Sequence, residues 1–223
     1  MRKKGFTLAE ILVTLGIIGV VSALTFPTVT QDITKQKVGP SLAKAVNTLE
    51  KANASLLKNT NTRSIYDACN TGDNDYSIET EYLSCLITNS DIMAAPLTGT
   101  SYGDSTYNNC IAGKDNIAFC TGTIDVSQGT TSLKNYHGTA VNIIIDINGP
   151  AGKPNKLGKD AFSFLVDFYG TLIPYGGRHY NVFMGKSTDA PLWQTTCNGD
   201  NFSNRMACAG SIVDNNWKVI YNY

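Results

Sequence analysis

Charge is scarce in this sequence. Charged residues make up 16% of the 223 residues, and 18 Lys and Arg balance 18 Asp and Glu. The basic residues do not gather into a stripe that would follow a phosphate backbone, so we expect no nucleic acid partner. Histidine is also scarce. Only His137 and His179 are present, and neither has metal-ligand spacing. No G-x-x-x-x-G-K phosphate loop occurs either. We therefore expect that the protein is not an enzyme.

Cysteine is present, but never as a C-x-x-C pair, which argues against a metal or thioredoxin-like site. An even number of cysteines in the C-terminal part of the chain is typical of disulfides in an oxidising compartment. The six are Cys69, Cys85, Cys110, Cys120, Cys197 and Cys208. They allow 15 connectivities. Short loops favour pairing between sequence neighbours, and the connectivity stays open.

An apolar segment occupies residues 6–26, where Glu10 is the single charged residue. A helix of this length reaches about 30 Å, the thickness of a bilayer core, so the segment predicts one membrane span. Residues 2–4 are basic, and the next basic residue is Lys35. This asymmetry keeps the N-terminus in the cytoplasm and places the cysteines outside.

A secretory signal peptide is the alternative interpretation of this segment, because Val21-Ser22-Ala23 offers a small-residue cleavage site. Glu10 argues against it. A carboxylate within an apolar helix costs roughly 3 kcal/mol on insertion scales and usually marks a function. An export signal gains nothing from such a residue.

The run Gly5-Phe6-Thr7-Leu8-Ala9-Glu10 after a short basic leader resembles the class III signal of type IV pilins and type II secretion pseudopilins. The resemblance implies that a prepilin peptidase cuts between Gly5 and Phe6 and methylates the new amine of Phe6. It also implies a subunit stored in the bacterial inner membrane.

By the same resemblance, Glu10 attracts the N-terminal amine of a neighbouring subunit, so that assembly neutralises two charges that are expensive in lipid. Neutralisation within one helix is the alternative, since the two groups lie four positions apart. Gly16 and Gly19 permit close helix packing, and Pro27 weakens the preceding turn. In assembled pilins the stretch that matches 19–27 can lose helicity; an ordinary kinked anchor is the alternative.

Beyond Pro27 an apolar stripe predicts that the helix continues to Lys58 and packs on a globular head. The stripe consists of Val38, Leu42, Ala45, Leu49, Ala52 and Leu56. Gly39-Pro40 predicts a bend or an interruption, because proline disfavours helical geometry at the residue before it. A coiled-coil partner is the other use of such a stripe.

The remaining sequence predicts an α+β head. Residues 59–135 are rich in turn formers and predict loops and short elements. From Ala140 onward, four segments are rich in β-branched and aromatic residues and predict an antiparallel sheet. They are Ala140–Ile147, Ala161–Phe168, Tyr180–Met184 and Trp217–Tyr221.

The loop between the first two of these strands spaces oxygen side chains among Gly and Pro residues. Calcium favours such oxygen ligands, and the major pseudopilins, which this chain resembles, bind calcium on a loop of the head. The candidate ligands are Asp146, Asn148, Asn155 and Asp160. Ordinary turn chemistry explains the same residues, so calcium is an optional cofactor in this interpretation. By the same resemblance, the region from Cys197 to Cys208 makes subunit contacts, or its disulfide only closes a loop.

Together these features predict a leader (1–5), a membrane and filament-core helix (6–26), an amphipathic continuation (27–58) and a disulfide-containing head (59–223). The leading hypothesis is a type II secretion pseudopilin. A surface type IV or minor pilin for adhesion, motility or DNA uptake is the main alternative, and an exported soluble domain is the third. The expected partners are copies of the chain, other pilins or pseudopilins, the prepilin peptidase, the inner-membrane assembly platform and the membrane.

Overall fold

The structure, a computed structural model, describes residues 5–69, 77–97, 100–102, 105–107, 109–121, 141–183, 190–199 and 201–221. The chain divides into two compact units. The N-terminal unit is Met1–Lys37, and the head is Val38–Tyr223.

Helix α1 spans Leu8–Thr60 and contributes to both units. Its extent confirms the predicted long helix. The predicted interruption at Gly39-Pro40 was wrong, because α1 continues through both residues. Gly39 serves close packing instead, since a Cβ at this position would collide with the carbonyl oxygen of Trp217.

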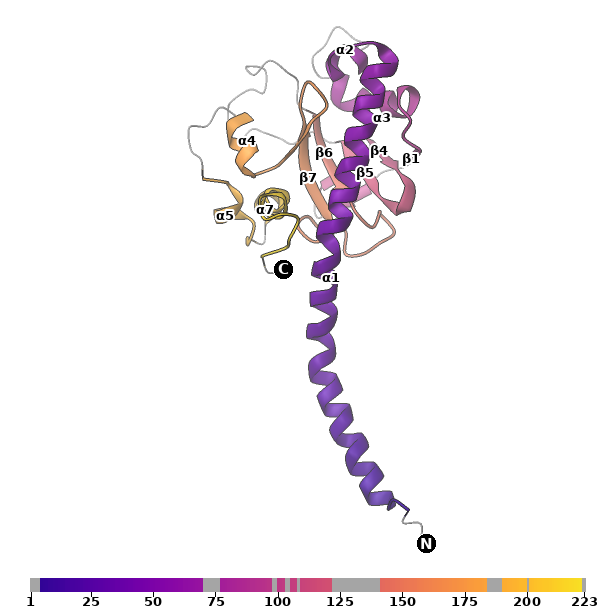
Figure 1. Cartoon of the computed structure of the whole chain (residues 1–223), viewed down its shortest axis with the longest axis vertical. Helices are drawn as coiled ribbons and strands as arrows, with labels where there is room; N and C mark the ends of the chain where they lie inside the picture. Colours follow the sequence, from indigo (N-terminus) through magenta and orange to yellow (C-terminus); the bar gives the residue numbers. More distant parts are fainter. Residues whose placement is uncertain are drawn as a thin grey trace. The chain divides into compact units, whose positions relative to one another are not determined.

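The head contains a six-stranded antiparallel sheet in the order β1-β4-β5-β6-β7-β8. Figure 1 labels β1, β4, β5, β6 and β7 of this sheet. The strands are β1 (Ala95–Leu97), β4 (Asn109–Ala112), β5 (Ala118–Thr121), β6 (Val141–Asp146), β7 (Ala161–Val166) and β8 (Leu172–Pro174). A separate hairpin pairs β2 (Thr100–Tyr102) with β3 (Ser105–Tyr107). This architecture confirms the predicted α+β class.

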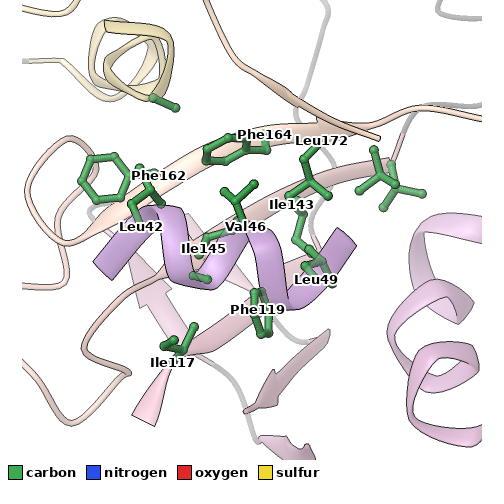
Figure 2. Packing of buried hydrophobic residues seen from close by; sticks show 14 of the residues in the cluster. Leu42, Val46, Leu49, Ile117, Phe119, Ile143, Ile145, Phe162, Phe164 and Leu172 are labelled. Atoms are coloured by element: carbon green, nitrogen blue, oxygen red, sulfur yellow. The ribbon is translucent and has the colours of Figure 1, made fainter. Parts of the chain in front are cut away.

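The main core lies between one face of the sheet and the Val38–Thr60 part of α1. Every residue of the predicted apolar stripe is buried. Figure 2 shows Leu42, Val46 and Leu49 of α1 among side chains of the central strands. The strand residues of this cluster include Phe119, Ile143, Ile145, Phe162 and Phe164. The stripe therefore has its partner within the chain, and the coiled-coil alternative is not needed for it.

The opposite face of the sheet is also covered. Side chains alternate along a strand, so Ile144 and Asp146 point away from the α1 face. Tyr102 and Tyr107 of the β2–β3 hairpin pack there, together with Cys110 and other buried residues. A buried polar side chain such as Asp146 consequently needs partners within the protein.

The region 59–135 holds more helix than the sequence predicted. It contains α2 (Ile65–Cys69) and the 13-residue helix α3 (Ser77–Asn89). Tyr82, Leu83 and Leu86 of α3 are fully buried at helical spacing. The turn formers around this short stripe obscured it, so the prediction of loops was wrong here, although the short strands β1 to β5 agree with it.

The prediction of a strand at Tyr180–Met184 was also wrong, because helix α4 covers Arg178–Phe183. The glycine pair 176–177 turns the chain just before it, and the Asp214 carboxylate accepts the amide of Arg178 at 3.1 Å. Three further short helices follow, namely α5 (Trp193–Thr196), α6 (Phe202–Met206) and α7 (Cys208–Asp214). Tertiary contacts thus overrode the β propensity of a short segment.

The last predicted strand, Trp217–Tyr221, is irregular in the structure. Asn216 and Trp217 have φ values of 56° and 62°, which a strand cannot adopt. The Trp217 amide donates to the carbonyl of Ile212 at 2.8 Å, and the Tyr221 hydroxyl donates to the carbonyl of Gly158 at 2.7 Å. The bulky residues of this tail reflect packing, not strand pairing.

Candidate functional site

The cleavage region predicted from sequence lies just outside α1. Gly5, Phe6 and Thr7 are non-helical and exposed, and the helix begins at Leu8. Phe6 is 85% exposed. The Gly5–Phe6 bond is therefore accessible without unwinding of the helix.

Thr7 and Glu10 form a capping box at the start of α1. The amide and the hydroxyl of Thr7 donate to Oε2 of Glu10 at 2.8 and 2.9 Å, and the Glu10 amide donates to the Thr7 hydroxyl at 3.3 Å. This arrangement satisfies amides that a helix N-terminus otherwise leaves unpaired. Sequence reasoning assigned no role to Thr7, although the T-x-x-E spacing signals it. Glu10 thus has a local structural role, and within the described residues its Oε1 accepts no hydrogen bond.

The apolar segment that follows is exposed along its whole length in the described structure. Residues 8–25 are long and apolar enough to cross a membrane, and all of them are exposed. Apart from the chain neighbours and the helix's own nearby backbone, no described atom lies within 4 Å of a Cβ built on Gly16 or Gly19. These glycines leave a smooth helix surface that another helix can approach closely. The side chain of Pro27 lies outside the described residues.

Residues 1–26 match the family model of the prokaryotic N-terminal methylation motif. The N-terminus is a prepilin-type signal. No curated protein and no solved structure matches the chain. The prepilin-type signal and the apolar helix together fit a membrane-anchored N-terminus.

Three disulfides stabilise the head that follows the prepilin-type signal. They are Cys69–Cys85, Cys110–Cys120 and Cys197–Cys208, so each cysteine pairs with its sequence neighbour. The first joins α2 to α3, the second joins paired residues of β4 and β5, and the third joins the end of α5 to the start of α7. All three close short loops, the arrangement that loop entropy favoured.

The four candidate calcium ligands lie together where β6 ends at Asp146 and in the loop that leads to β7. Oδ1 of Asp146 accepts the amides of Asn148 and Gly149 at 3.1 and 2.9 Å, and Oδ2 accepts the Tyr102 hydroxyl at 2.9 Å. Asp160 accepts the amides of Asn155 and Lys156 at 2.8 and 2.7 Å. Burial raises the pKa of Asp146 to about 6, against the hydrogen bonds from Asn148 and Tyr102 that lower it.

These contacts show the turn chemistry that was the alternative to calcium, because both carboxylates hold backbone amides. Two atoms remain unexplained by it. Oδ1 of Asn148 and Oδ1 of Asn155 are buried and have no hydrogen-bond partner. The described residues contain no group of three or more His, Cys, Asp or Glu that could hold a metal ion. An oxygen-only set of two carboxylates and two amides nevertheless suits a hard cation such as calcium.

A serine motif in the chain lacks the structural context of a nucleophile. Residues 99–103 read G-x-S-x-G, and Ser101 lies within β2 opposite Thr106. A nucleophile elbow instead places its serine on a strand-to-helix turn. His179 is exposed in α4, and His137 lies outside the described residues.

Proposed function

We propose that this chain is a pseudopilin, a subunit of the short periplasmic filament of a type II secretion system. One observation carries the proposal. A prepilin-type signal introduces an apolar helix that is exposed on every side from Leu8 to Thr25, while the same helix continues into an α+β head. Such a helix needs lipid before assembly and other subunits after it.

Processing prepares the chain for assembly. Removal of residues 1–5 creates an ammonium group at Phe6, four positions before Glu10. Since Thr7 occupies Oε2 of Glu10, the other carboxylate oxygen remains available to an amine from a neighbouring subunit. Entry into the filament then pairs two charges that are expensive in the apolar phase. An assembly ATPase acting through the inner-membrane platform supplies the work of extraction.

The disulfide-stabilised head favours one second candidate, a surface minor pilin. Three disulfides and helices α4 to α7 elaborate the sheet. A head with such additions suits a contact role at a filament tip as well as a place within a secretion filament.

Deletion of the gene tests the two candidates against each other. Loss of secreted enzymes with intact surface fibres supports the pseudopilin, and loss of surface fibres with normal secretion supports the pilin. Sequencing of the mature N-terminus tests both, because we expect methylated Phe6 as the first residue. A mature protein that begins at Leu24 would instead identify an exported soluble domain.

We also propose that the β6–β7 loop binds calcium. The two buried amide oxygens without partners, beside two buried carboxylates, support this proposal. Calorimetric titration of the full chain with and without chelator should give heat and a thermal shift that Asp160→Asn removes. The matched control, Asp115→Asn, lies in an exposed turn and should bind normally. No heat and no shift at millimolar calcium contradict the proposal.

A further inference from the structure

Three segments meet at one end of the head, and we call them the basal loops: residues 113–117, 147–160 and 215–221. The first two lie together because Ala118 pairs with Asp146 at the strand ends, and the Asn116 side chain donates to the carbonyl of Asn148. The third joins them through the hydrogen bond from Tyr221 to Gly158. The same end of the head holds the first turns of its α1 part, because Gly39 packs against Trp217.

The basal loops carry a net positive charge at their surface. Their lysines are Lys114, Lys153, Lys156, Lys159 and Lys218, and all except the half-buried Lys159 are exposed. Their carboxylates are Asp115 and Asp160, and Asp146 ends β6 just before the second of the loops. Asp146 and Asp160 are buried and hold backbone amides, and Asp115 pairs with Lys44 of α1 at 2.5 Å. The exposed lysines therefore dominate the electrostatic potential of this end.

The described segments at the opposite end of the head are balanced in charge. There the β7–β8 turn meets α1, since the Asn53 side chain donates to the carbonyl of Gly170 at 2.7 Å. The segments 58–64, 90–94 and 167–171 of this end carry Lys58, Arg63, Asp91 and Asp167. Of the two sets of segments, the basal loops thus carry the excess of lysine.

An exposed apolar side chain accompanies the lysines. Ile220 is 56% exposed and lies between the half-buried Val219 and the buried Tyr221, two positions after Lys218. Lysine side chains and an exposed aliphatic side chain together suit a membrane surface, where an apolar layer lies just beneath a charged one.

Chain connectivity limits how far the basal loops can lie from a membrane. The candidate span ends at Thr25 and the head begins at Val38, so twelve residues, 26–37, separate them. If these residues are helical, they rise about 18 Å from the edge of the hydrocarbon core, and the headgroup layer covers about 6 Å of this rise. The distance left between the headgroup layer and the start of the head is close to the Debye length of about 10 Å at 0.1 M salt. Lysine side chains extend into that gap.

We propose that the basal loops form a contact surface for anionic phospholipid headgroups, which holds the head against the membrane before the subunit enters the filament. The proposal rests on the proposed membrane anchoring with the head outside. The recognised chemistry is the phosphate-bearing, negatively charged headgroup, with Lys153, Lys156 and Lys218 as its cationic partners and Ile220 reaching the layer below.

Lysine acetylation of the full chain in lipid nanodiscs tests this surface. One set of discs contains phosphatidylcholine alone, and the other contains equal parts phosphatidylcholine and phosphatidylglycerol. In the anionic discs we expect Lys153, Lys156 and Lys218 to react roughly fivefold more slowly than in the neutral discs. This factor corresponds to the gain in binding free energy of about 1 kcal/mol that one lysine has at an anionic surface. High salt should remove the difference, and Lys58 should react equally in both discs.

A charge-reversal pair sharpens the test. Lys153→Glu/Lys156→Glu should abolish the protection of Lys218 in anionic discs, while the matched control Lys51→Glu/Lys58→Glu, exposed on α1, should preserve it. Equal reaction rates in the two kinds of disc overturn the proposal. Protection in cells without protection in anionic discs also overturns it and assigns the surface to a protein partner. Failure of the chain to insert into either disc contradicts the proposed anchoring instead.

Discussion

The two parts of α1 differ in what surrounds them. From Leu8 to Thr25 the helix is apolar and exposed on every side, whereas from Val38 to Leu56 only one stripe is apolar and it is buried on the sheet. A helix that is apolar all round cannot satisfy its surface in water, but a helix with one stripe needs a single partner. The second part finds its partner in its own chain, and the proposed function assigns the first part to lipid and to other subunits.

Loss of the Glu10 charge should have the largest effect, on the part of α1 that depends on other molecules. We expect Glu10→Ala to leave processing largely intact and to block filament assembly, because the incoming amine loses its carboxylate. Filament yield in sheared fractions and N-terminal sequencing measure the two steps. Glu10→Gln separates charge from capping, since its amide oxygen can still accept from Thr7. Normal assembly of Glu10→Gln would remove the charge-pair argument.

Matched leucine substitutions compare the two parts directly. Leu49→Ala should lower the free energy of unfolding of the head by about 2–5 kcal/mol, since Leu49 is fully buried. Leu15→Ala should leave that free energy unchanged, because Leu15 is 60% exposed in the chain. Denaturant unfolding followed by tryptophan fluorescence measures both. A head destabilised equally by Leu15→Ala contradicts the division of α1.

Matched glycine substitutions test close packing in the same way. Gly39→Ala should destabilise the head by about 1–3 kcal/mol, because the added Cβ meets the Trp217 carbonyl. Gly16→Ala adds the same methyl group where no described atom beyond the helix's own nearby backbone lies within 4 Å, so thermal unfolding of the head should not change. Its effect should appear in filament yield. A fully stable Gly39→Ala head would show that the tail moves aside.

Acidification should stabilise the head through Asp146. Its folded pKa of about 6 lies above the usual value of 3.8, so between these values the folded state binds more protons than the unfolded state. Its contribution to stability is therefore lost as the pH rises through 6, with a slope of at most about 1.4 kcal/mol per pH unit. Between pH 5 and 6, urea unfolding should show that the free energy of unfolding falls further in the wild type than in Asp146→Asn. The difference should be at most about 1.4 kcal/mol. Parallel pH profiles contradict the prediction.

The ion pair between Lys44 and Asp115 should have the smallest effect. Both side chains are 60% exposed, so solvent and salt screen their attraction. We expect Lys44→Ala to change the free energy of unfolding by at most about 0.5 kcal/mol, with less effect at high salt. A loss above 1 kcal/mol, on the order of a buried contact, would mean that this pair holds the 113–117 turn on α1.

Periodicity predicted long elements well and short ones poorly. All six residues of the stripe from Val38 to Leu56 are buried, because six positions at helical spacing leave little ambiguity about the face that packs on the sheet. The strand predictions at Ala140–Ile147 and Ala161–Phe168 lie within two residues of β6 and β7. The five-residue segments near the C-terminus failed, since composition alone cannot distinguish a packed helix or tail from a strand.

A local motif in the sequence specifies one part of the candidate site. Gly5, Phe6 and Glu10 belong to one continuous signal, whereas the cap formed by Thr7 needed the helix start to be located. Asp146 shows the other limit. Its hydrogen bond from Tyr102 joins residues 44 positions apart, across the second face of the sheet, and no sequence pattern indicates that pairing.

The contact between Gly39 and Trp217 constrains when the head can fold. In the proposed topology the chain leaves the cytoplasm with the start of the head first and its tail last. Gly39 packs against the Trp217 carbonyl, and the Tyr221 hydroxyl donates a hydrogen bond to the carbonyl of Gly158. The first and last turns of the head close on each other, so the native fold is completed only after translocation ends. A subunit stalled in the translocation channel lacks this closure and cannot present a finished head to the filament.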